Sequence, residues 1–339
     1  MRSLLRILFV LFLSSSLLAA GWLAYYVFKP LPGHGEVLVV LPKGAGSRQI
    51  MALLGEKGVI KDDLRFLALV RLLREIERDN PPKLRAGEFH VPLGLTPLQV
   101  IRFLHTAKPV QYRVTIPEGL TMAQVADIFA KQGWADRAVF LQLCQDKKFL
   151  NKLGVRADSL EGYLFPETYS LVRGETDEQI LITSMVRRFF AVWKELNPTE
   201  LSAQEAKYSP QQLLILASIV EKETGAASER KTIAGVFYNR LRIGMRLQSD
   251  PTTIYGIKDF NGNLTKADLL AETPYNTYVI SGLPIGPICN PGKAALEAVL
   301  HPAEVPYLYF VSKNDGSHQF SRTLEEHNRA VSVYQKRKN

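Results

Sequence analysis

The sequence has few of the residues from which disulfide frameworks and metal sites are built. Its 339 residues include only two cysteines, Cys144 and Cys289, which lack the paired spacing of a zinc site. Whether these two pair depends on the distance between their Cα atoms, which the sequence does not contain. The six histidines are scattered, with no His-x-x-x-His pair on a helix, and there is no nucleophile-elbow motif. We therefore expect no metal and no cofactor, and neither a metalloenzyme nor a Ser-His hydrolase.

Long runs of one charge are also missing. The 42 Lys and Arg residues outnumber the 33 Asp and Glu residues and give a net charge of +9, but they are spread over the whole chain. No basic tract is long enough for a nucleic-acid-binding arm, so we expect no nucleic-acid partner. A diffuse positive surface suits an acidic polymer or an anionic membrane equally well. With 46% hydrophobic residues, the chain is expected to bury the core of one long domain or of two to three modest ones.

One long apolar run stands at the N-terminus. Arg2 and Arg6 precede an uncharged stretch over residues 7–28, long enough as a helix to cross a bilayer. The short basic N-terminal side favours an orientation with residues 1–6 in the cytoplasm and everything after Lys29 outside it. The alternative is a cleaved signal peptide ending near Gly21, but the apolar stretch continues past that point, which favours a retained anchor.

A Pro/Gly-rich linker over residues 29–36 is followed by a repeated pattern. Residues 39–50 and 114–125 share a β-rich run, a Pro-x-Gly turn and an amphipathic helical pattern, and residues 91–100 are a weaker copy. These units resemble LysM-type modules, which are small carbohydrate-binding folds. The alternative is a purely structural strand–turn–helix device. We assign residues 37–135 to a LysM-like α/β module and residues 136–339 to a catalytic domain.

A central helix is predicted in the second half of the chain. Ser209 followed by Pro210 and then Gln212 forms a helix start, with a capping residue, Pro in the first turn and Gln at the third position. Residues 213–220 are apolar on nearly every side, so the helix should lie buried in the centre of the domain, and Gly225 can close it. The expected fold class is therefore α+β, with a transmembrane helix, the LysM-like module and a catalytic domain around this helix.

The end of this helix carries the candidate catalytic group. Glu223 shares a helix face with the apolar Val220 and Ile219, whereas Glu221 follows Ala217 and Ser218. Burial and the negative end of the helix dipole both disfavour the ionised carboxylate and should raise the pKa of Glu223. Such a group serves as a proton donor near neutral pH. The alternative is an ordinary charged helix end.

Polar and aromatic loops follow this helix and are expected to form a groove for a sugar chain. Amide, hydroxyl and aromatic groups on rigid Pro- and Gly-containing backbone are the contacts that such a groove needs. The candidate substrate-binding residues are Glu221, Asn239, Arg240, Gln248, Asp250, Tyr255, Tyr275, Asn276 and Tyr278.

Four of these segments carry a family resemblance. Residues 217–224 (ASIVEKET), 239–253 (NRLRIGMRLQSDPTT), 275–278 (YNTY) and 282–284 (GLP) resemble the endolytic murein transglycosylase family, also called YceG-like. The resemblance implies that the second acid of the Glu-Lys-Glu-Thr motif, Glu223, is catalytic. It also implies a single-pass inner-membrane protein with a periplasmic domain that cuts nascent peptidoglycan glycan strands internally, between N-acetylmuramic acid and N-acetylglucosamine. Such an enzyme would terminate strand elongation near peptidoglycan synthases, the penicillin-binding proteins.

Three hypotheses follow for the activity. In the first, protonated Glu223 donates to the glycosidic oxygen and then accepts the proton of the muramic acid C6 hydroxyl, which closes a 1,6-anhydro ring without water. In the second, the protein is a muramidase that uses water, with Glu221 or Asp250 as the second carboxylate. In the third, it is a non-enzymatic peptidoglycan-binding scaffold that positions synthases through its LysM-like units.

Overall fold

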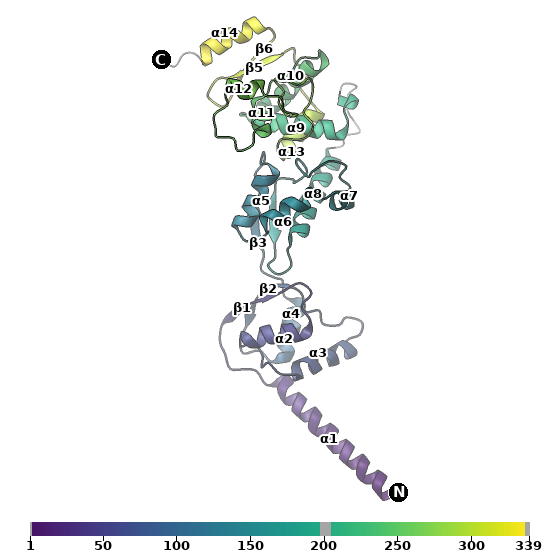
Figure 1. The fold of residues 1–339 in the computed structure, drawn as a ribbon. Helices are drawn as coiled ribbons and strands as arrows, with labels where there is room; N and C mark the ends of the chain where they lie inside the picture. The colour runs from purple at the N-terminus through teal and green to yellow at the C-terminus, as the bar shows by residue number, and fades with distance from the viewer. Residues whose placement is uncertain (1, 197–204, 336–339) are drawn as a thin grey trace. The chain divides into compact units, whose positions relative to one another are not determined.

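The structure, a computed structural model, describes residues 2–196 and 205–335 and combines helices with short strands (Figure 1). The helices are α1 (Arg2–Phe28), α2 (Ser47–Glu56), α3 (Arg65–Ile76), α4 (Pro97–Thr106), α5 (Met122–Lys131), α6 (Arg137–Leu143), α7 (Lys147–Lys152), α8 (Glu178–Glu195), α9 (Pro210–Glu223), α10 (Arg230–Arg242), α11 (Asp250–Gly256), α12 (Lys266–Leu270), α13 (Lys293–Leu300) and α14 (Leu324–Tyr334). The 3-10 turns are η1 (Glu205–Lys207) and η2 (Ala227–Glu229), and the strands are β1 (Glu36–Leu41), β2 (Gly87–Pro92), β3 (Tyr112–Thr115), β4 (Thr168–Leu171), β5 (Tyr309–Ser312) and β6 (His318–Ser321). This mixture confirms the predicted combination of helices and strands.

The chain divides into two compact units. Unit 1 is Met1–Val114 with Ser170–Thr176, and unit 2 is Thr115–Tyr169 with Asp177–Asn339. The chain passes from one unit to the other along β3 and returns along β4, and these two strands pair with each other. The boundary that we predicted between residues 135 and 136 falls inside unit 2. The predicted ranges also include residues 1, 197–204 and 336–339, which lie outside the described residues.

Helix α1 is the apolar N-terminal segment. Its portion Leu4–Phe28 is long and apolar enough to cross a membrane, by length and composition. Most of its large apolar side chains are exposed, but Tyr26 and Val27 at its end are buried in the core of unit 1. The Tyr26 hydroxyl donates a hydrogen bond to the Lys61 carbonyl (3.2 Å). The last turn of α1 therefore belongs to the folded part of unit 1.

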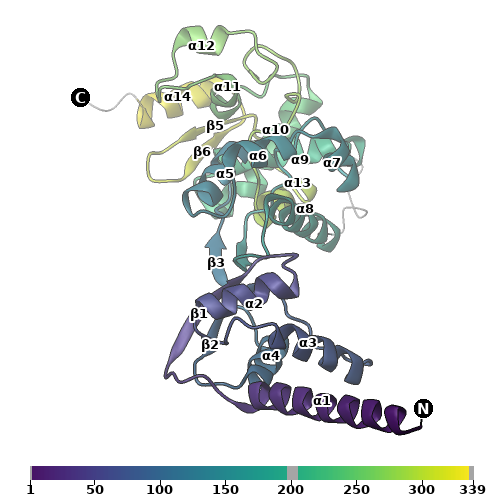
Figure 2. The same ribbon diagram turned by 60° about the horizontal axis from the view of Figure 1, so that its bottom comes forward.

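The rest of unit 1 is a small α/β module. Strands β1 and β2 pair antiparallel, with Glu36 opposite Pro92 and Leu41 opposite Gly87. Helices α2 and α4 lie beside this pair, and α3 packs against α2 and α4 (Figure 2). The core that they share is apolar; its largest fully buried side chains include Phe66, Phe89, Leu54 and Leu104.

The repeated sequence pattern forms the same local structure three times. Each copy is a strand, a turn and a helix: β1 with α2, β2 with α4, and β3 with α5. The turn glycines Gly44, Gly94 and Gly119 have φ of 78°, 82° and 75°, a left-handed conformation that favours glycine. Thr96 and Thr121 begin α4 and α5 with full capping boxes, whereas α2 starts at Gly46 without a side-chain cap.

Helix α9 lies in the centre of unit 2, as the sequence predicted. It begins with the capping box of Ser209 and Gln212, and residues 213–220 are all buried. Helices α10 and α13 pack against it. The carbonyl oxygen of Gly316 lies 2.3 Å from where a Cβ of Gly225 would stand, so a larger residue at position 225, the second after this helix, would force the backbone to shift. Cys144 and Cys289 are both buried free thiols.

Candidate active site

A cavity of about 420 Å³ opens beside the end of α9. Its walls come from α9, α10, α11, the loop before α11, the β5–β6 hairpin and α14, and they include the aromatic side chains Tyr278, Tyr309 and Phe310. Aromatic faces next to polar groups are suited to bind sugar rings. Five of the ten residues predicted from the sequence line this cavity: Glu223, Arg240, Gln248, Asp250 and Tyr278.

Glu223 is the last residue of α9 and the acid at this cavity. Part of the residue is accessible through the cavity, while its carboxyl group is otherwise surrounded by protein. Burial raises the pKa of this carboxyl group, and the negative charge of Asp250 raises it further. The hydrogen bond from Ser249 and the charges of His318 and Arg240 act in the opposite direction and lower this pKa. The net effect favours the protonated acid.

Ser249 holds one oxygen of this carboxyl group. Its hydroxyl donates to Glu223 Oε1 at 2.5 Å, and the residue itself is 1% exposed. Ser249 stands at the capping position of α11, but its side chain makes no cap there. A serine before a short helix is an ordinary capping residue, so the local sequence gives no sign that this hydroxyl is directed to Glu223 instead.

Asp250 is the second carboxylate at the cavity. It accepts a hydrogen bond from the Tyr278 hydroxyl to its Oδ1 at 2.6 Å. Gln248, two positions earlier, has a φ of 47°, which is rare for a residue other than glycine. Gln248 in the loop before α11 and Asp250 at the first position of α11 thus lie at the cavity wall in a defined arrangement.

Arg240 contributes a buried positive charge. It is 6% exposed, and its guanidinium donates to the Leu308 carbonyl (Nε, 2.7 Å) and to the Leu247 carbonyl (Nη1, 2.5 Å). Burial lowers the pKa of Arg240, whereas Glu223 raises it. Arg240 therefore joins the strand region before β5 to the loop before α11 and places a cation near the acid.

Glu221 does not line the cavity. Its Oε2 accepts the backbone N–H of Gly292 (3.0 Å), and its Oε1 lies 3.9 Å from Nη2 of Arg230. Burial raises the pKa of this carboxyl group as well. Two residues apart on one helix, Glu221 and Glu223 face different surroundings, and of the two proposed second carboxylates only Asp250 shares the cavity with Glu223.

The two predicted asparagines are engaged with the backbone. Asn239 donates to the carbonyls of Val305 (2.6 Å) and Tyr307 (3.0 Å). Asn276 is fully buried, and its Nδ2 donates to three carbonyl groups, of which the nearest is that of Ala271 (2.7 Å). Both side chains hold loops together, and neither lines the cavity.

Tyr255 and Tyr275 form a separate cluster around Glu161. The Tyr255 hydroxyl donates to Glu161 Oε2 (3.0 Å), and the rings of Tyr255 and Tyr275 meet edge to face with centroids 4.7 Å apart. Burial raises the pKa of Glu161 to about 7. None of these three residues lines the cavity with Glu223.

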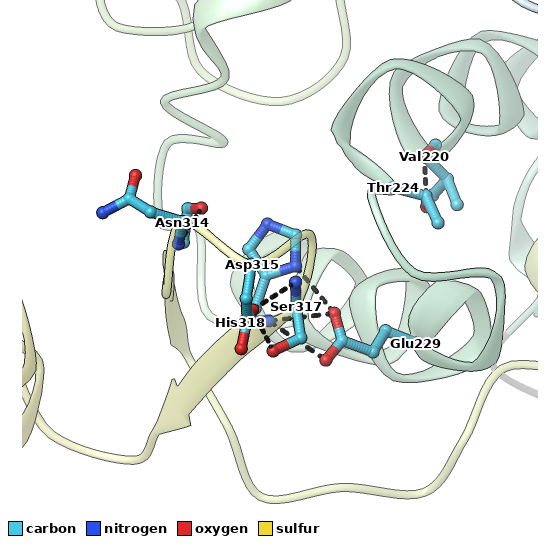
Figure 3. Close-up of polar contacts among 8 residues, drawn as sticks. Val220, Thr224, Glu229, Asn314, Asp315, Ser317 and His318 are labelled. Carbon is cyan, nitrogen blue, oxygen red and sulfur yellow. Dashed lines mark hydrogen bonds and ion pairs between the residues drawn. The ribbon is translucent and has the colours of Figure 1, made fainter. Parts of the chain in front are cut away.

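The β5–β6 hairpin brings a histidine to the cavity that the sequence did not single out. The Nδ1 of His318 lies 2.7 Å from Oε2 of Glu229 (Figure 3), and the side chain of His318 is 11% exposed. In the sequence the histidines are scattered, and no motif points to the one at position 318. His327 of α14 also lines the cavity and stacks on Tyr309. Among the described residues, no group of three or more His, Cys, Asp or Glu side chains could hold a metal ion.

Known proteins similar to this chain agree on one family. The model of the YceG-like family matches residues 39–333. An endolytic murein transglycosylase of Bacillus subtilis (strain 168) is 31% identical over 318 residues, which cover 89% of this chain and 86% of that protein. An endolytic murein transglycosylase of Streptococcus pneumoniae serotype 2 (strain D39) is 30% identical over 364 residues, covering 96% of this chain and 64% of that longer protein.

A solved structure has a similar fold. The crystal structure of a YceG-like protein from Listeria monocytogenes superposes with a TM-score of 0.57 at 32% sequence identity. The similarity covers 88% of this chain and 99% of that chain.

Proposed function

The chain belongs to the YceG-like family, and from this premise we propose that it is an endolytic murein transglycosylase with Glu223 as its catalytic acid. The curated relatives that carry this name support the activity. The observation on which the proposal mainly rests is the position of Glu223: a carboxyl group whose pKa is raised by burial and which still borders an open cavity. Such an acid holds its proton more strongly than an exposed glutamate does and can meet a substrate at the cavity.

The proposed reaction needs one acid and no water. Glu223 donates its proton to the oxygen between N-acetylmuramic acid and N-acetylglucosamine, and the bond from the muramic acid C1 to that oxygen breaks. The C6 hydroxyl oxygen of the same muramic acid attacks C1, and its proton passes to the Glu223 carboxylate. The products are a 1,6-anhydromuramoyl end and a free N-acetylglucosamine hydroxyl, and the enzyme returns to its protonated state.

The cavity supplies the other groups that this reaction needs. The carboxylate of Asp250 can stabilise positive charge that develops at C1 in the transition state. Tyr278, Tyr309 and Phe310 offer aromatic faces for the sugar rings. Of the predicted substrate-binding residues, Arg240, Gln248, Asp250 and Tyr278 are therefore proposed to contact the glycan strand, whereas Glu221, Asn239, Tyr255, Tyr275 and Asn276 are proposed to act through the loops that they hold.

Product analysis tests this proposal. The detergent-solubilised full chain and its Glu223→Gln variant are incubated with purified peptidoglycan, and the muropeptides are identified by mass spectrometry. We expect anhydromuramoyl products from the wild type and none from the variant. Reducing ends would instead support a muramidase that uses water with Asp250 as its second carboxylate, since Asp250 shares the cavity with Glu223. Binding without any product from either protein would support the scaffold.

We also propose that α1 is a retained anchor in the inner membrane, with both units on the periplasmic side. The exposed apolar surface of Leu4–Phe28 and the packing of Tyr26 and Val27 into unit 1 support this. The intact mass of the protein purified from membranes tests it, because signal-peptide cleavage near Gly21 would remove about the first 20 residues. Protease accessibility in spheroplasts tests the orientation.

Unit 1 is proposed to be a LysM-like module that holds glycan strands. Its order of strand, two helices and strand, with β1 and β2 paired, is a compact scaffold for such a role. Sedimentation of the Glu223→Gln chain with insoluble peptidoglycan, compared with a chain lacking this module, tests glycan binding. Peptidoglycan synthases are the proposed partners, and cross-linking in cells to penicillin-binding proteins tests that association.

A further inference from the structure

The backbone of the β5–β6 hairpin determines the position of His318 at the cavity. It is the first residue of β6 and follows the turn over residues 313–317 directly. The turn is closed by the Lys313 N–H donating to the Ser317 carbonyl (2.9 Å), and Asp315 accepts hydrogen bonds from both the N–H and the hydroxyl of Ser317. The imidazole therefore projects from a well-defined hairpin into the wall of the cavity that Glu223 also lines.

Glu229 holds this histidine by its backbone and by its ring. The His318 N–H donates to both oxygens of the Glu229 carboxylate (3.0 and 3.1 Å), and its Nδ1 lies 2.7 Å from Oε2. Because a carboxylate only accepts hydrogen bonds, Nδ1 must carry a proton, and the ring orientation is fixed. Nε2 lies on the other side of the ring, and in Figure 3 the second ring nitrogen points away from Glu229.

The hairpin is also in close contact with the end of α9. A Cβ on Gly225 would lie 2.3 Å from the Gly316 carbonyl oxygen, so the turn and the residue two positions after Glu223 are in van der Waals contact. Thr224, between them, donates its hydroxyl to the Val220 carbonyl (2.7 Å), which closes the last turn of α9 (Figure 3). The acid and the histidine are thus carried by two backbone segments that are packed against each other.

The charge of His318 affects the ionisation of Glu223. The charge of His318 is one of the influences that lower the pKa of Glu223, against the larger effect of burial. Arg240 acts in the same direction, but its guanidinium is engaged with the carbonyls of Leu308 and Leu247. His318 differs from Arg240 because its charge depends on a proton.

We propose that Glu229 and His318 form a positioning pair for Glu223, in which the imidazolium stabilises the carboxylate that Glu223 becomes after it has protonated the glycosidic oxygen. This inference rests on the proposed function of Glu223 and deepens it. His318 acts through Glu223 and transfers no proton to the sugar. Without the pair, burial and Asp250 would hold the proton on Glu223 too tightly for efficient donation.

Other titratable groups lie at the same cavity and can also change the pH dependence of the activity. Glu229 contacts His318 from outside the cavity lining, and the titratable or charged residues that line the cavity together with His318 are Glu223, Arg240, Asp250, Tyr278, Tyr309 and His327. The pKa of His327 is lowered by burial and by Arg240, and this ring stacks on Tyr309 without a carboxylate partner. An experiment must therefore observe the ionisation of Glu223 itself.

The test is a titration of Glu223 by ¹³C NMR in the full chain labelled at the glutamate carboxyl carbon, with Glu223→Gln to assign the signal. In His318→Gln and Glu229→Gln we expect the pKa of Glu223 to rise by about 1, the effect of losing one nearby opposite charge. The pH profile of anhydromuramoyl formation should move its alkaline limb upward by the same amount, and the rate on the plateau should fall about tenfold. Glu229→Asp should restore part of the pKa of Glu223 and part of the plateau rate. The control is His301→Gln, because His301 is exposed and lies outside the cavity; it should change neither the pKa nor the rate.

The outcomes separate a positioning role from a structural one. A lower rate and a lower melting temperature with an unmoved Glu223 titration would mean that the pair only holds the hairpin, and would overturn the inference. Normal titration and normal rate in both variants would overturn it too. If the wild type forms no anhydro ends, the proposed function fails, but the NMR titration still tests the pair because it needs no substrate. The second variant, Glu229→Gln, keeps the test open if His318→Gln does not fold.

Discussion

Two regions of unit 2 each bury a carboxyl group, and their surroundings differ. Glu161 lies in the segment between α7 and β4, is 4% exposed, and has a pKa raised to about 7 by burial. Glu223 ends α9, and burial raises its pKa as well. By the direction of the pKa shift alone, both groups are candidates for a catalytic acid.

Hydrogen bonding and access separate the two regions. The oxygens of Glu161 accept from the Met122 N–H (2.9 and 3.1 Å), from Asn290 Nδ2 (3.2 Å) and from the Tyr255 hydroxyl (3.0 Å). Among the described residues, only Ser249 donates to the side chain of Glu223. Glu223 lines the 420 Å³ cavity and Glu161 does not. A buried carboxyl group whose two oxygens both accept hydrogen bonds connects the loops that donate them. A buried carboxyl group that borders a cavity and accepts one hydrogen bond from the described residues can react with a substrate.

The largest expected effect is at Glu223. Glu223→Gln removes the proton donor, so the rate of strand cleavage should fall by about 10³-fold, while the melting temperature should change little because the amide is uncharged, like the protonated acid that it replaces. Glu161→Gln is the matched variant, with the same change in the other region. Comparable loss of cleavage in well-folded Glu161→Gln protein would break the distinction drawn here. Muropeptide release and calorimetry on both proteins measure it.

The next effect in size is at Ser249. Ser249→Ala removes the hydroxyl that donates to Glu223, which should raise the pKa of this carboxyl further and weaken it as an acid. A hydrogen bond to a charged group is worth about 1.5–3 kcal/mol, so we expect a 10- to 100-fold loss of rate. Ser249→Thr, which keeps the hydroxyl, is the control. A pH profile with an unmoved alkaline limb would show that Ser249 does not set the ionisation of Glu223.

Glu161 should contribute to the dependence of stability on pH. Its pKa is about 7 in the folded protein against 4.5 for an ordinary glutamate, so between these values the folded state retains a proton that the unfolded state releases. Stability should therefore fall as pH rises from about 4.5 to about 7, by about 3 kcal/mol at most. Calorimetry over this range should show a shallower decline for Glu161→Gln. An equal decline in both proteins would place the titrating group elsewhere.

The smallest effect is expected at Glu221, which lies two residues from the catalytic candidate. Glu221→Gln keeps an oxygen for the Gly292 N–H and loses the 3.9 Å contact with Arg230. We expect a change in stability of about 1 kcal/mol or less and an unchanged cleavage rate. A large loss of cleavage with normal stability would show that Glu221 reaches the substrate, and would contradict its position outside the cavity.

Local sequence patterns were sufficient to predict much of this architecture. The start of α9 follows from Ser209, Pro210 and Gln212, because a capping box is complete within four consecutive positions. The left-handed turn glycines follow from the Pro-x-Gly repeat in the same way. The raised pKa of Glu223 was also predictable, since an apolar helix run that ends in an acid already contains the physical cause.

Packing between distant segments decided the rest. The sequence placed Tyr255, Tyr275 and Asn276 among the groove residues because their types suit sugar binding, but hydrogen bonds to Glu161 and to backbone carbonyls engage Tyr255 and Asn276 outside the cavity. Residue type shows what a side chain is able to bind. It does not show in which direction the side chain points.

The sequence by itself therefore determined the start of α9, the turn glycines of the repeat and the acid at the end of α9, because each depends on neighbours within a few positions. Only the tertiary structure brought Ser249 to Glu223 across 26 residues and His318 to Glu229 across 89. No periodicity relates residues so far apart. Which hydroxyl, carboxylate or imidazole lies beside the acid is decided by how α9, α10, α11 and the β5–β6 hairpin pack around one cavity.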